Sequence, residues 1–506
     1  MARTILKGGR VLRGSDLALA QNPMDIVIEG DRIQAIEPDV AVQDQDNVVD
    51  VSGLLMVPGL INGHFHSSEH FQKGRVENLP LEIWSQYMRA PLAVQLTARQ
   101  TYLRTMIGAI EALRSGTTTV VDDLIPGPLF NPENIRAALQ AYKDIGIRAM
   151  VGFAMFDRAL VDHFPFSDVA FSPAELTRLR ALPRPDGMAV VEFCRELLCE
   201  HHPRKSRVGV IVSASAPQRC TEEFLRHCRR FADENDLPVI IHVQETRLQV
   251  VTGKEFYGMT MVEYLDSIGF LGPRTSLIHA VWLNPRELEA LARTGASAQH
   301  NPWSNLTLGS GLQPVRELLE AGVNVSMGSD GTCSTMTCNM LTVLGSTAAL
   351  SKLRGDDYSR WVSAKEALKI ATQGGAKALG FENELGVIEN GAIADIVGYR
   401  LDSISFAPLN DAIRQLVYAE RGQGIYFSMV AGEVVMRDGA LVRIPEMQIL
   451  SDIAREHAAL QDGFAREEAA VAPFAAAMEK IYLRSLEMPV APDTFPARIP
   501  TVRPSH

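Results

Sequence analysis

The sequence predicts an α/β protein: a (β/α)8 barrel of the TIM type, a small β-sandwich domain formed from both ends of the chain, and a helical C-terminal tail. Three observations lead to this prediction. Apolar runs alternate with helix-like segments, strand-and-turn patterns occur near both ends, and several apolar runs end in a histidine or an aspartate. Such alternation is typical of a parallel barrel, whose active site lies where its strands end. We expect residues 1–57 and 385–445 to form the β-sandwich, 58–384 the barrel and 446–506 the helical, proline-rich extension.

The two ends of the chain share a pattern of short strands and tight turns. Strand-like stretches cover residues 4–7, 8–12, 25–36, 391–399 and 428–439. Gly30 and Asp31 are expected to form a hairpin turn. Neither end is long enough to bury one face of a sheet alone. We therefore expect the two ends to pair into one small domain.

Eight strand candidates lie between these ends. They are the strand that ends at His64, preceded by the apolar run 54–57, and residues 117–122, 149–153, 208–212, 239–242, 276–279, 296–300 and 324–328. Helical segments are expected at residues 99–115, 132–146, 222–234, 285–293 and 313–321. Residues 157–202 are expected to form a long loop that could shape a substrate entrance. The tail is expected to form an amphipathic helix over about 447–484, followed by a proline-rich end from Pro489, and to pack on the barrel or on another subunit.

Composition excludes several classes of protein. Of the 506 residues, 46% are hydrophobic and 22% are charged, as in ordinary globular proteins. The net charge of −11 argues against nucleic acid as a partner, because phosphate binding needs clustered Lys and Arg. No apolar run approaches the length of a membrane span, and the first residues lack a signal core. Six cysteines in so long a chain do not indicate a disulfide framework, so we expect a cytoplasmic protein with reduced thiols.

Four of the strand ends carry side chains that bind metal ions. His64 and His66 follow the first strand, and His242, His279 and Asp330 follow the fifth, sixth and eighth. A strand directs residues i and i+2 to one face, so His64 and His66 can point at the same ion. Neutral histidine nitrogens with one carboxylate suit Zn²⁺ or Fe²⁺ rather than Ca²⁺ or Mg²⁺.

The same residues can activate water. An ion in this site would lower the pKa of a bound water far below its bulk value, towards about 7. Asp330 can serve both as ligand and as the base that takes the proton of that water. Glu245 lies three residues after His242 and could pass a proton to the substrate, although a solvated loop position is the alternative. His279 is either a ligand or a hydrogen-bond donor, and His300, at the end of the seventh strand, either contacts substrate or is structural.

These residues lie in motifs that resemble the amidohydrolase superfamily. The resemblance is to the aminohydrolase branch with the cytosine, guanine and thioadenosine/adenosylhomocysteine deaminases and the triazine hydrolases, and it spans about residues 1–445. The motifs are residues 57–66, 79–84, 115–119, 242–246, His279, 300–311, 328–331, 371–380 and 386–397.

The resemblance implies a role for each matching residue. His64, His66, His242 and Asp330 would bind one metal ion, Zn²⁺ in the first place and Fe²⁺ as the alternative. Glu245 would pass a proton to a ring nitrogen, and His279 would contact the water or the substrate. The matching motif also places Trp84 among the substrate contacts. Two-metal members use a carboxylated lysine at the end of strand four, and residues 208–217 contain no lysine, so one ion is expected.

Three loops depart from the pattern of the nucleoside deaminases. They are residues 67–75, 216–219 and 332–338, which are expected to line the mouth of the pocket. The substrate could therefore differ while the metal chemistry stays the same. Gln218 and Arg219 could bind an anionic or carbonyl group through forked hydrogen bonds, or could lie at the surface.

The sequence thus predicts a metal-dependent hydrolase that cleaves a carbon–nitrogen bond. Deamination of an N-heterocycle of the purine, pteridine, pyrimidine or triazine type is the leading hypothesis. The same site would also suit an amide, urea or carbamate hydrolase or a triazine dehalogenase, and a non-catalytic scaffold is a remote alternative, because no ligand is missing. The expected partner is a small molecule, and the resemblance implies a homo-oligomer of two or more subunits.

Overall fold

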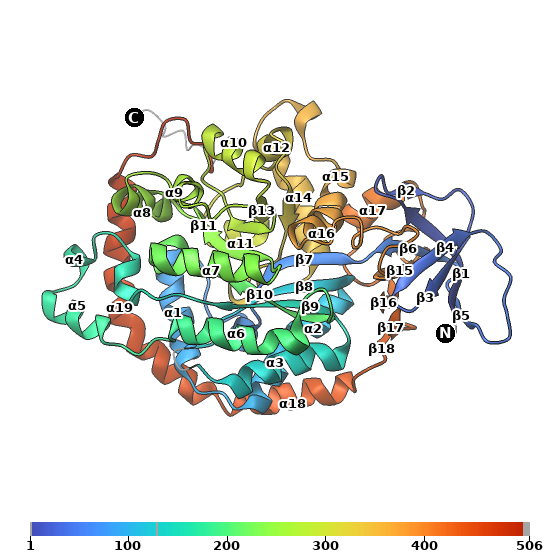
Figure 1. The fold of residues 1–506 in the computed structure, drawn as a ribbon, viewed down its shortest axis with the longest axis horizontal. Helices are drawn as coiled ribbons and strands as arrows, with labels where there is room; N and C mark the ends of the chain where they lie inside the picture. Colours follow the sequence, from blue (N-terminus) through green and yellow to red (C-terminus); the bar gives the residue numbers. More distant parts are fainter. Residues whose placement is uncertain (1–2, 128–129, 499–506) are drawn as a thin grey trace.

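The barrel predicted from the sequence forms the centre of the molecule (Figure 1). The computed structural model describes residues 3–127 and 130–498, without the side chains of 89–93. Eight parallel strands follow one another in chain order: β7 (Leu60–Phe65), β8 (Thr117–Leu124), β9 (Arg148–Ala154), β10 (Val208–Ser213), β11 (Val239–Val243), β12 (Thr275–His279), β13 (Ser297–His300) and β14 (Val325–Met327). The first and last strands lie side by side, where the Asp330 amide donates a hydrogen bond to the His64 carbonyl oxygen at 2.9 Å.

Apolar side chains fill the barrel interior. Six successive strands each contribute one residue to a buried cluster: Ile61, Val121, Met150, Ile211, Ile240 and Ile278. The barrel is therefore a packed core, and only its C-terminal end is free to form a site.

Helices cover the outside of the barrel: α2 (Ala98–Arg114), α3 (Pro132–Ile145), α6 (Gly187–His201), α7 (Glu222–Glu234), α8 (Arg247–Tyr257), α9 (Met261–Ser267), α10 (Pro285–Thr294), α12 (Val315–Glu320), α14 (Met340–Leu350), α15 (Ala364–Lys369) and α16 (Gly375–Ala378). Local sequence sets their ends. The Thr97 side chain caps α2 in a capping box with Gln100, and α3 ends at Gly146 with a φ of 85°.

Shorter helices complete the loops: η1 (Ser67–Gln72), α1 (Leu81–Ala93), η2 (Leu160–His163), α4 (Ser167–Ala170), α5 (Pro173–Arg180), η3 (Pro217–Arg219), α11 (Pro302–Thr307), α13 (Thr332–Thr335), η4 (Ser351–Leu353), η5 (Tyr358–Arg360), η6 (Ile370–Gly374) and α17 (Ala412–Tyr418). The expectation of a long loop at 157–202 is wrong, because η2, α4, α5 and α6 occupy most of it. Capping side chains on Ser172 and Asp186 start α5 and α6.

Both ends of the chain form a second, mixed sheet, as predicted (Figure 1). Its strands are β1 (Thr4–Arg13), β2 (Ala18–Leu19), β3 (Met24–Glu29), β4 (Arg32–Glu37), β5 (Asn47–Asp50), β6 (Leu54–Pro58), β15 (Ile396–Arg400), β16 (Ile425–Val430), β17 (Glu433–Arg437) and β18 (Ala440–Leu441). The long strand β1 pairs with β3 at one end and with β6 at the other. One apolar cluster, which includes Leu6, Ile28, Met56 and Phe427, joins the two halves.

The apolar run 54–57 belongs to this second sheet rather than to the barrel. As β6 it pairs with β1 and β15, and a separate strand, β7, carries His64. The chain changes sheets at Gly59, where a Cβ atom would lie 2.0 Å from the Thr118 hydroxyl. This close approach explains why the change of sheet takes place at a glycine.

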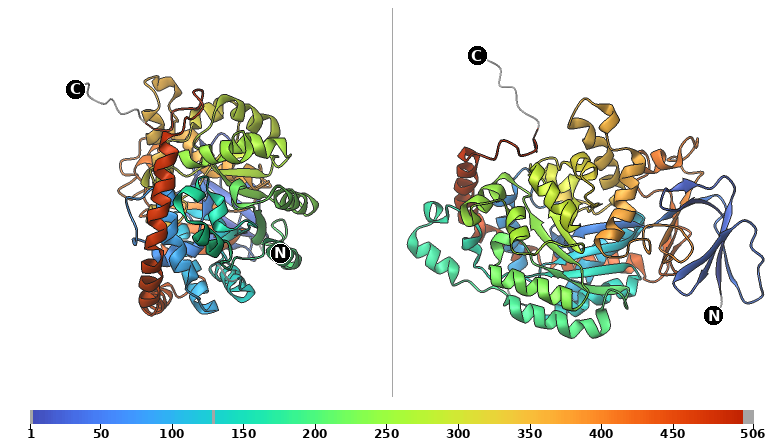
Figure 2. Two further views of the ribbon diagram at one scale, coloured as in Figure 1. Left: turned by 90° about the vertical axis from the view of Figure 1, so that its left-hand side faces the viewer. Right: turned by 45° about the horizontal axis from the view of Figure 1, so that its top comes forward.

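The C-terminal extension forms two helices, α18 (Glu446–Ala458) and α19 (Gln461–Glu487), rather than the single helix expected over about 447–484. The helix α19 lies along α1 at the side of the barrel (Figure 2). Residues 488–498 then run over the barrel mouth, and the last part of the proline-rich end lies outside the described residues. The described part of the chain contains no helix long and apolar enough to cross a membrane.

Candidate metal centre and active site

Four histidines and an aspartate meet at the C-terminal end of the barrel. Two overlapping groups could each hold a metal ion, His64 with His66 and His242, and His64 with His279 and Asp330. In each group the ligand atoms lie within 4.8 Å of one another. The geometry thus brings together all five residues that the strand ends indicated.

Strand geometry places the first two histidines. His64 lies near the end of β7, and His66 follows in an extended conformation as the residue that precedes η1. Their ring centroids are 4.6 Å apart, and the His242 ring lies 5.0 Å from that of His64. The i and i+2 positions therefore face the same point, which β11 also reaches.

Hydrogen bonds at Nδ1 orient three of the histidines. Their Nδ1 atoms lie near oxygen acceptors: the Asp123 carbonyl oxygen at 2.7 Å from His66, the Ser215 carbonyl oxygen at 2.9 Å from His242, and the Asn305 side-chain oxygen at 3.0 Å from His279. A carbonyl oxygen only accepts, so in each case Nδ1 carries the proton and donates. Burial lowers the pKa of His242 and His279, so their Nε2 atoms are left as lone-pair donors, the arrangement typical of metal-binding histidines. Despite burial, the carboxylates of Glu69, Asp123 and Asp330 raise the pKa of His66 to about 9, so its Nε2 would become a ligand when a cation displaces the proton.

His64 gives the strongest indication of a metal. Its side chain is fully buried, and within the described residues neither ring nitrogen has a hydrogen-bond partner. Burial lowers the pKa of His64, so the ring is neutral. A buried imidazole without a partner is costly, and a bound cation would satisfy it. The donor set of neutral imidazoles and one carboxylate fits a transition metal such as zinc.

Asp330 faces the histidines from the other side. One carboxylate oxygen lies 3.5 Å from Nε2 of both His64 and His66, and the other lies 3.6 Å from Nε2 of His279. Burial raises the pKa of Asp330, but the neighbouring His64, His279 and His66 outweigh it and hold that pKa well below its usual value. Its backbone has a φ of 69°, a left-handed conformation that is uncommon for a residue other than glycine.

Glu245 lies beside this group, two residues after the end of β11. Its carboxylate is 3.4 Å from Nε2 of His279 and accepts a hydrogen bond from the Ser310 hydroxyl at 3.2 Å. Burial, together with the charges of Asp330 and Glu82, raises the pKa of Glu245 well above its usual value. Such a carboxyl group can hold a proton at neutral pH and release it.

The centre opens into a cavity of about 100 Å³. Its apolar wall consists of Leu81, Trp84, Met88, Ile125 and Leu308, and its polar wall includes Glu69, Asp123 and Arg219. The Trp84 indole nitrogen is buried without a partner among the described residues. Arg219 donates a hydrogen bond to the Ser215 hydroxyl at 3.1 Å. An apolar wall with a few convergent polar groups is typical of a small-molecule site.

Glu69 and Asp123 were missed in the sequence. Asp123 is buried 3.7 Å from Nδ1 of His242 and 4.0 Å from Nδ1 of His66, and neither of its carboxylate oxygens has a hydrogen-bond partner among the described residues. Burial raises the pKa of Glu69 to about 7, and one of its carboxylate oxygens also lacks a described partner. The sequence could have indicated Asp123, because it lies at the end of the second strand. Glu69 lies in a 3₁₀ turn after the first strand, which no strand pattern predicts.

His300 and Gln218 are not among the residues that line the cavity. On β13 the preceding residue, Gln299, contacts Gly63 and Ser326 in the barrel interior, so His300 faces the other side of the strand. Gln218 is buried in the short helix η3, where its neighbour Arg219 reaches the cavity instead. The geometry therefore supports Trp84 and Arg219 as substrate contacts and gives no support for His300 or Gln218.

Known proteins resemble this chain over most of its length. It is 32% identical to a 5'-deoxyadenosine deaminase of Methanothermobacter thermautotrophicus over 88% of this chain and 94% of the relative. A 5-methylthioadenosine/S-adenosylhomocysteine deaminase of Thermococcus kodakarensis is 32% identical over 85% and 93%. A zinc-complexed atrazine chlorohydrolase of Arthrobacter aurescens superposes with a TM-score of 0.81 at 25% identity, over 90% of this chain and all of the other. A sequence model of the amidohydrolase family matches residues 55–435, and the chain belongs to that family.

Proposed function

We propose that this protein is a metal-dependent deaminase of an N-heterocycle, with adenine nucleosides as the first substrates to test. The observation that carries the proposal is the convergence of four histidines and Asp330 on one point, with Glu245 beside it. Two relatives named as adenine-nucleoside deaminases cover most of the chain. The apolar wall around Trp84 offers a flat surface for a heterocycle.

One divalent ion would be held by His64, His66, His242 and Asp330. We propose Zn²⁺, with Fe²⁺ as the alternative, because the donors are imidazole nitrogens and one carboxylate. When bound, such an ion supplies Lewis acidity and a water of lowered pKa. The strand β10, Val208–Ser213, contains no lysine that could bridge a second ion.

Each residue around the ion would have a different role in the proton transfers. Asp330 faces the ligand histidines and can accept a proton from the attacking water. Glu245, held by Ser310, can give a proton to a ring nitrogen of the substrate. His279 Nε2 lies beside both carboxylates while its Nδ1 donates to Asn305, so the Nε2 lone pair can accept a hydrogen bond from the attacking water. Asp330 can then give its proton to the amino group, which leaves as ammonia when the carbon–nitrogen bond breaks, while Glu245 can take the hydroxyl proton as the carbonyl forms.

The polar wall would orient the heterocycle. The Glu69 carboxylate can accept hydrogen bonds from the N–H or O–H groups of a substrate, and the buried Trp84 indole can donate one. Arg219 can donate to a ring nitrogen or carbonyl oxygen on the opposite side. Buried polar groups without partners favour substrates that complete their hydrogen bonds.

Ammonia release tests the proposal. The zinc-loaded protein is assayed with 5-methylthioadenosine, 5'-deoxyadenosine, adenosine, guanine and cytosine, beside a panel of amides, ureas and chlorotriazines. We expect ammonia from at least one heterocycle, and a loss of kcat of roughly 10²–10⁴-fold in Glu245→Gln. Glu255→Gln, an exposed position on α8, the helix that follows Glu245, is the matched control. Amine release from ureas, or chloride from triazines, with no ammonia from the heterocycles would contradict the proposal.

The cellular location and the oligomeric state of the protein stay predictions. A cytoplasmic location and a homo-oligomer of two or more subunits are expected from the sequence and its resemblance. Sedimentation of the purified protein would measure the number of subunits.

A further inference from the structure

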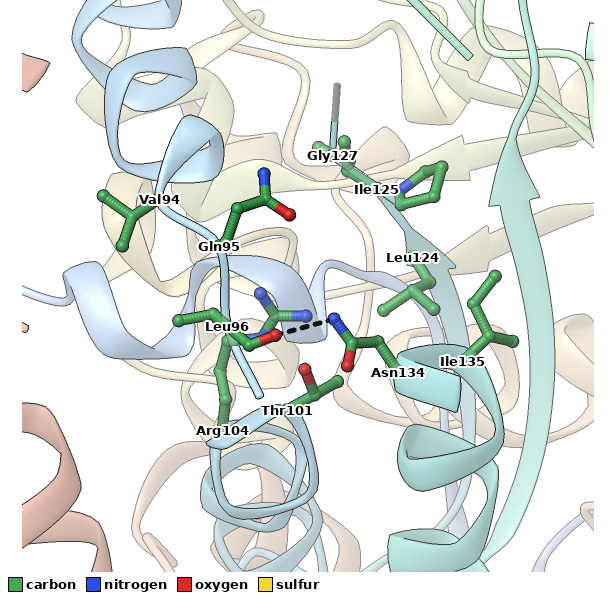
Figure 3. Close-up of a pocket in the computed structure, with 11 residues that line it drawn as sticks. Val94, Gln95, Leu96, Thr101, Arg104, Leu124, Ile125, Gly127, Asn134 and Ile135 are labelled. Carbon is green, nitrogen blue, oxygen red and sulfur yellow. Dashed lines mark hydrogen bonds between the residues drawn. The ribbon is translucent and has the colours of Figure 1, made fainter. Parts of the chain in front are cut away.

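A second cavity lies beside the active site, on the other side of the end of β8. Its lining comes from the segment after α1, from α2, from the loop after β8 and from α3 (Figure 3). Asp123 lines the active-site cavity, Leu124 lines the second one, and Ile125 lines both. The two cavities are therefore neighbours that share one apolar side chain as a wall.

The charge in this second cavity comes from Arg104. The residue is 8% exposed, and Figure 3 shows its guanidinium turned toward the cavity, with Gln95, Thr101 and Asn134 around it. Among the described residues no hydrogen bond or ion pair involves the guanidinium, and its buried Nε atom has no partner. Burial lowers the pKa of Arg104 only to about 10, so the side chain stays positive at neutral pH.

The nearby carboxylate does not neutralise this charge by direct contact. Asp122 acts on Arg104 electrostatically, but its oxygens are used elsewhere. One accepts the Ser67 amide at 2.8 Å and the other accepts the Tyr142 hydroxyl at 2.8 Å. The buried Nε donor of Arg104 has no described partner, which is costly because buried charges in proteins are otherwise paired.

Asn134 adds a hydrogen-bond acceptor to the cavity. The Asn134 amide nitrogen donates to the Leu96 carbonyl oxygen at 3.0 Å, and its side-chain oxygen is buried without a described partner. A ligand that satisfies the cavity thus needs an anionic fork for Arg104 and an N–H or O–H donor for Asn134. A carboxylate with a neighbouring ammonium or hydroxyl group has both.

We propose that this cavity binds a carboxylate through Arg104. The carboxylate belongs either to the far arm of the substrate in the adjoining active site or to a separate small acid. The first source rests on the proposed deaminase function. An adenine nucleoside with an amino-acid arm, such as S-adenosylhomocysteine, carries a carboxylate with a neighbouring ammonium group, whereas 5-methylthioadenosine carries no carboxylate.

The binding of a free carboxylate tests the site without any turnover. Acetate is titrated into the metal-loaded protein at constant ionic strength, with chloride as the reference, and the melting temperature is recorded. We expect acetate to raise the melting temperature of the unaltered protein and of Arg104→Lys, but not of Arg104→Met. The control Arg99→Met removes a charge from the same helix, from an exposed side chain that pairs with Asp452 at 2.6 Å and lies outside the cavity lining. An equal acetate effect in Arg104→Met, or none in the unaltered protein, overturns the proposal.

Deamination kinetics then identify the source. If the substrate supplies the carboxylate, Arg104→Met lowers kcat/KM for S-adenosylhomocysteine by roughly 10–100-fold and leaves 5-methylthioadenosine within about twofold. An acetate effect with unchanged kinetics on both nucleosides assigns the site to a separate acid. An equal loss on both nucleosides, or a fall in melting temperature without acetate, makes Arg104 a structural residue and refutes the site. If the unaltered protein deaminates neither nucleoside nor any other heterocycle, the proposed function fails while the acetate titration still decides the site.

Discussion

A buried ion pair at the opposite end of the barrel from the metal centre gives the sharpest test of the fold. Arg148, the first residue of β9, donates two hydrogen bonds of 3.1 Å to Asp395, which precedes β15 of the second sheet. The two side chains are 6% and 3% exposed. Asp395 also accepts the Ala431 amide at 2.7 Å, so the pair joins the barrel to the β domain.

Removal of Arg148 leaves the Asp395 carboxylate buried without its counterion. For pairs of this kind the loss is about 3–5 kcal/mol of unfolding free energy. At about 2.1 cal/mol/K per residue, a chain of 506 residues has an unfolding entropy of roughly 1 kcal/mol/K. We therefore expect Arg148→Met to lower the melting temperature by about 3–5 °C.

Differential scanning calorimetry at a fixed scan rate measures this shift, and ammonia release at 25 °C measures kcat. The double variant Arg148→Met/Asp395→Asn removes the stranded charge and keeps the acceptor for Ala431, so it should regain roughly half of the loss. Because Arg148 begins a strand whose other end faces the site, kcat should stay within about twofold. A shift below about 1 °C, or a tenfold loss of kcat in folded Arg148→Met, would refute the reasoning.

Four further predictions concern the site. His64→Ala should lose the bound metal, because it removes a ligand whose ring nitrogens have no hydrogen-bond partner among the described residues. Plasma mass spectrometry measures the metal content. Ser310→Ala should lower kcat about tenfold at unchanged metal content, since Glu245 loses the donor that orients it. Steady-state kinetics measure kcat, and an unchanged kcat would contradict this role of Ser310. Trp84→Ala should raise KM roughly 10–100-fold with a smaller effect on kcat, because the substrate loses the flat surface of the indole. A fall of kcat at unchanged KM would contradict this role. A chain that ends at Met488 should keep its metal and lose roughly tenfold in kcat, because Leu312 and Arg354 lose their contacts with the terminal segment.

The metal ligands could be predicted from the sequence because each lies at or just beyond the end of a strand. A short apolar run followed by His242 or His279 marks both the strand and its C-terminal end, and in a barrel these ends meet. The same logic could have found Asp123, which follows the run of the second strand. It fails for Glu69, which lies in a 3₁₀ turn, whereas His300, which does not line the cavity, stays an untested prediction.

Two errors in the elements have local physical causes. The run 54–57 is as apolar as a barrel strand because it is buried between β1 and β15, so hydrophobicity could not assign it to the correct sheet. The helices α5 and α6 within 157–202 begin at Ser172 and Asp186, whose side chains cap the first backbone amides. Those caps are visible in the sequence, and the loop prediction overlooked them.

The C-terminal extension connects the pocket to a part of the chain that lies beyond the family match at residue 435. The helix α19 packs on α1, which contributes Leu81 and Trp84 to the cavity wall. Arg247, which begins α8 two residues after Glu245, donates hydrogen bonds to the carbonyl oxygens of Ser485 and Met488. The extension therefore supports both the wall that would hold a heterocycle and the segment that would protonate it. Since the metal ligands lie inside the family match and these supports lie outside it, changes in the extension should alter KM and kcat without altering metal affinity.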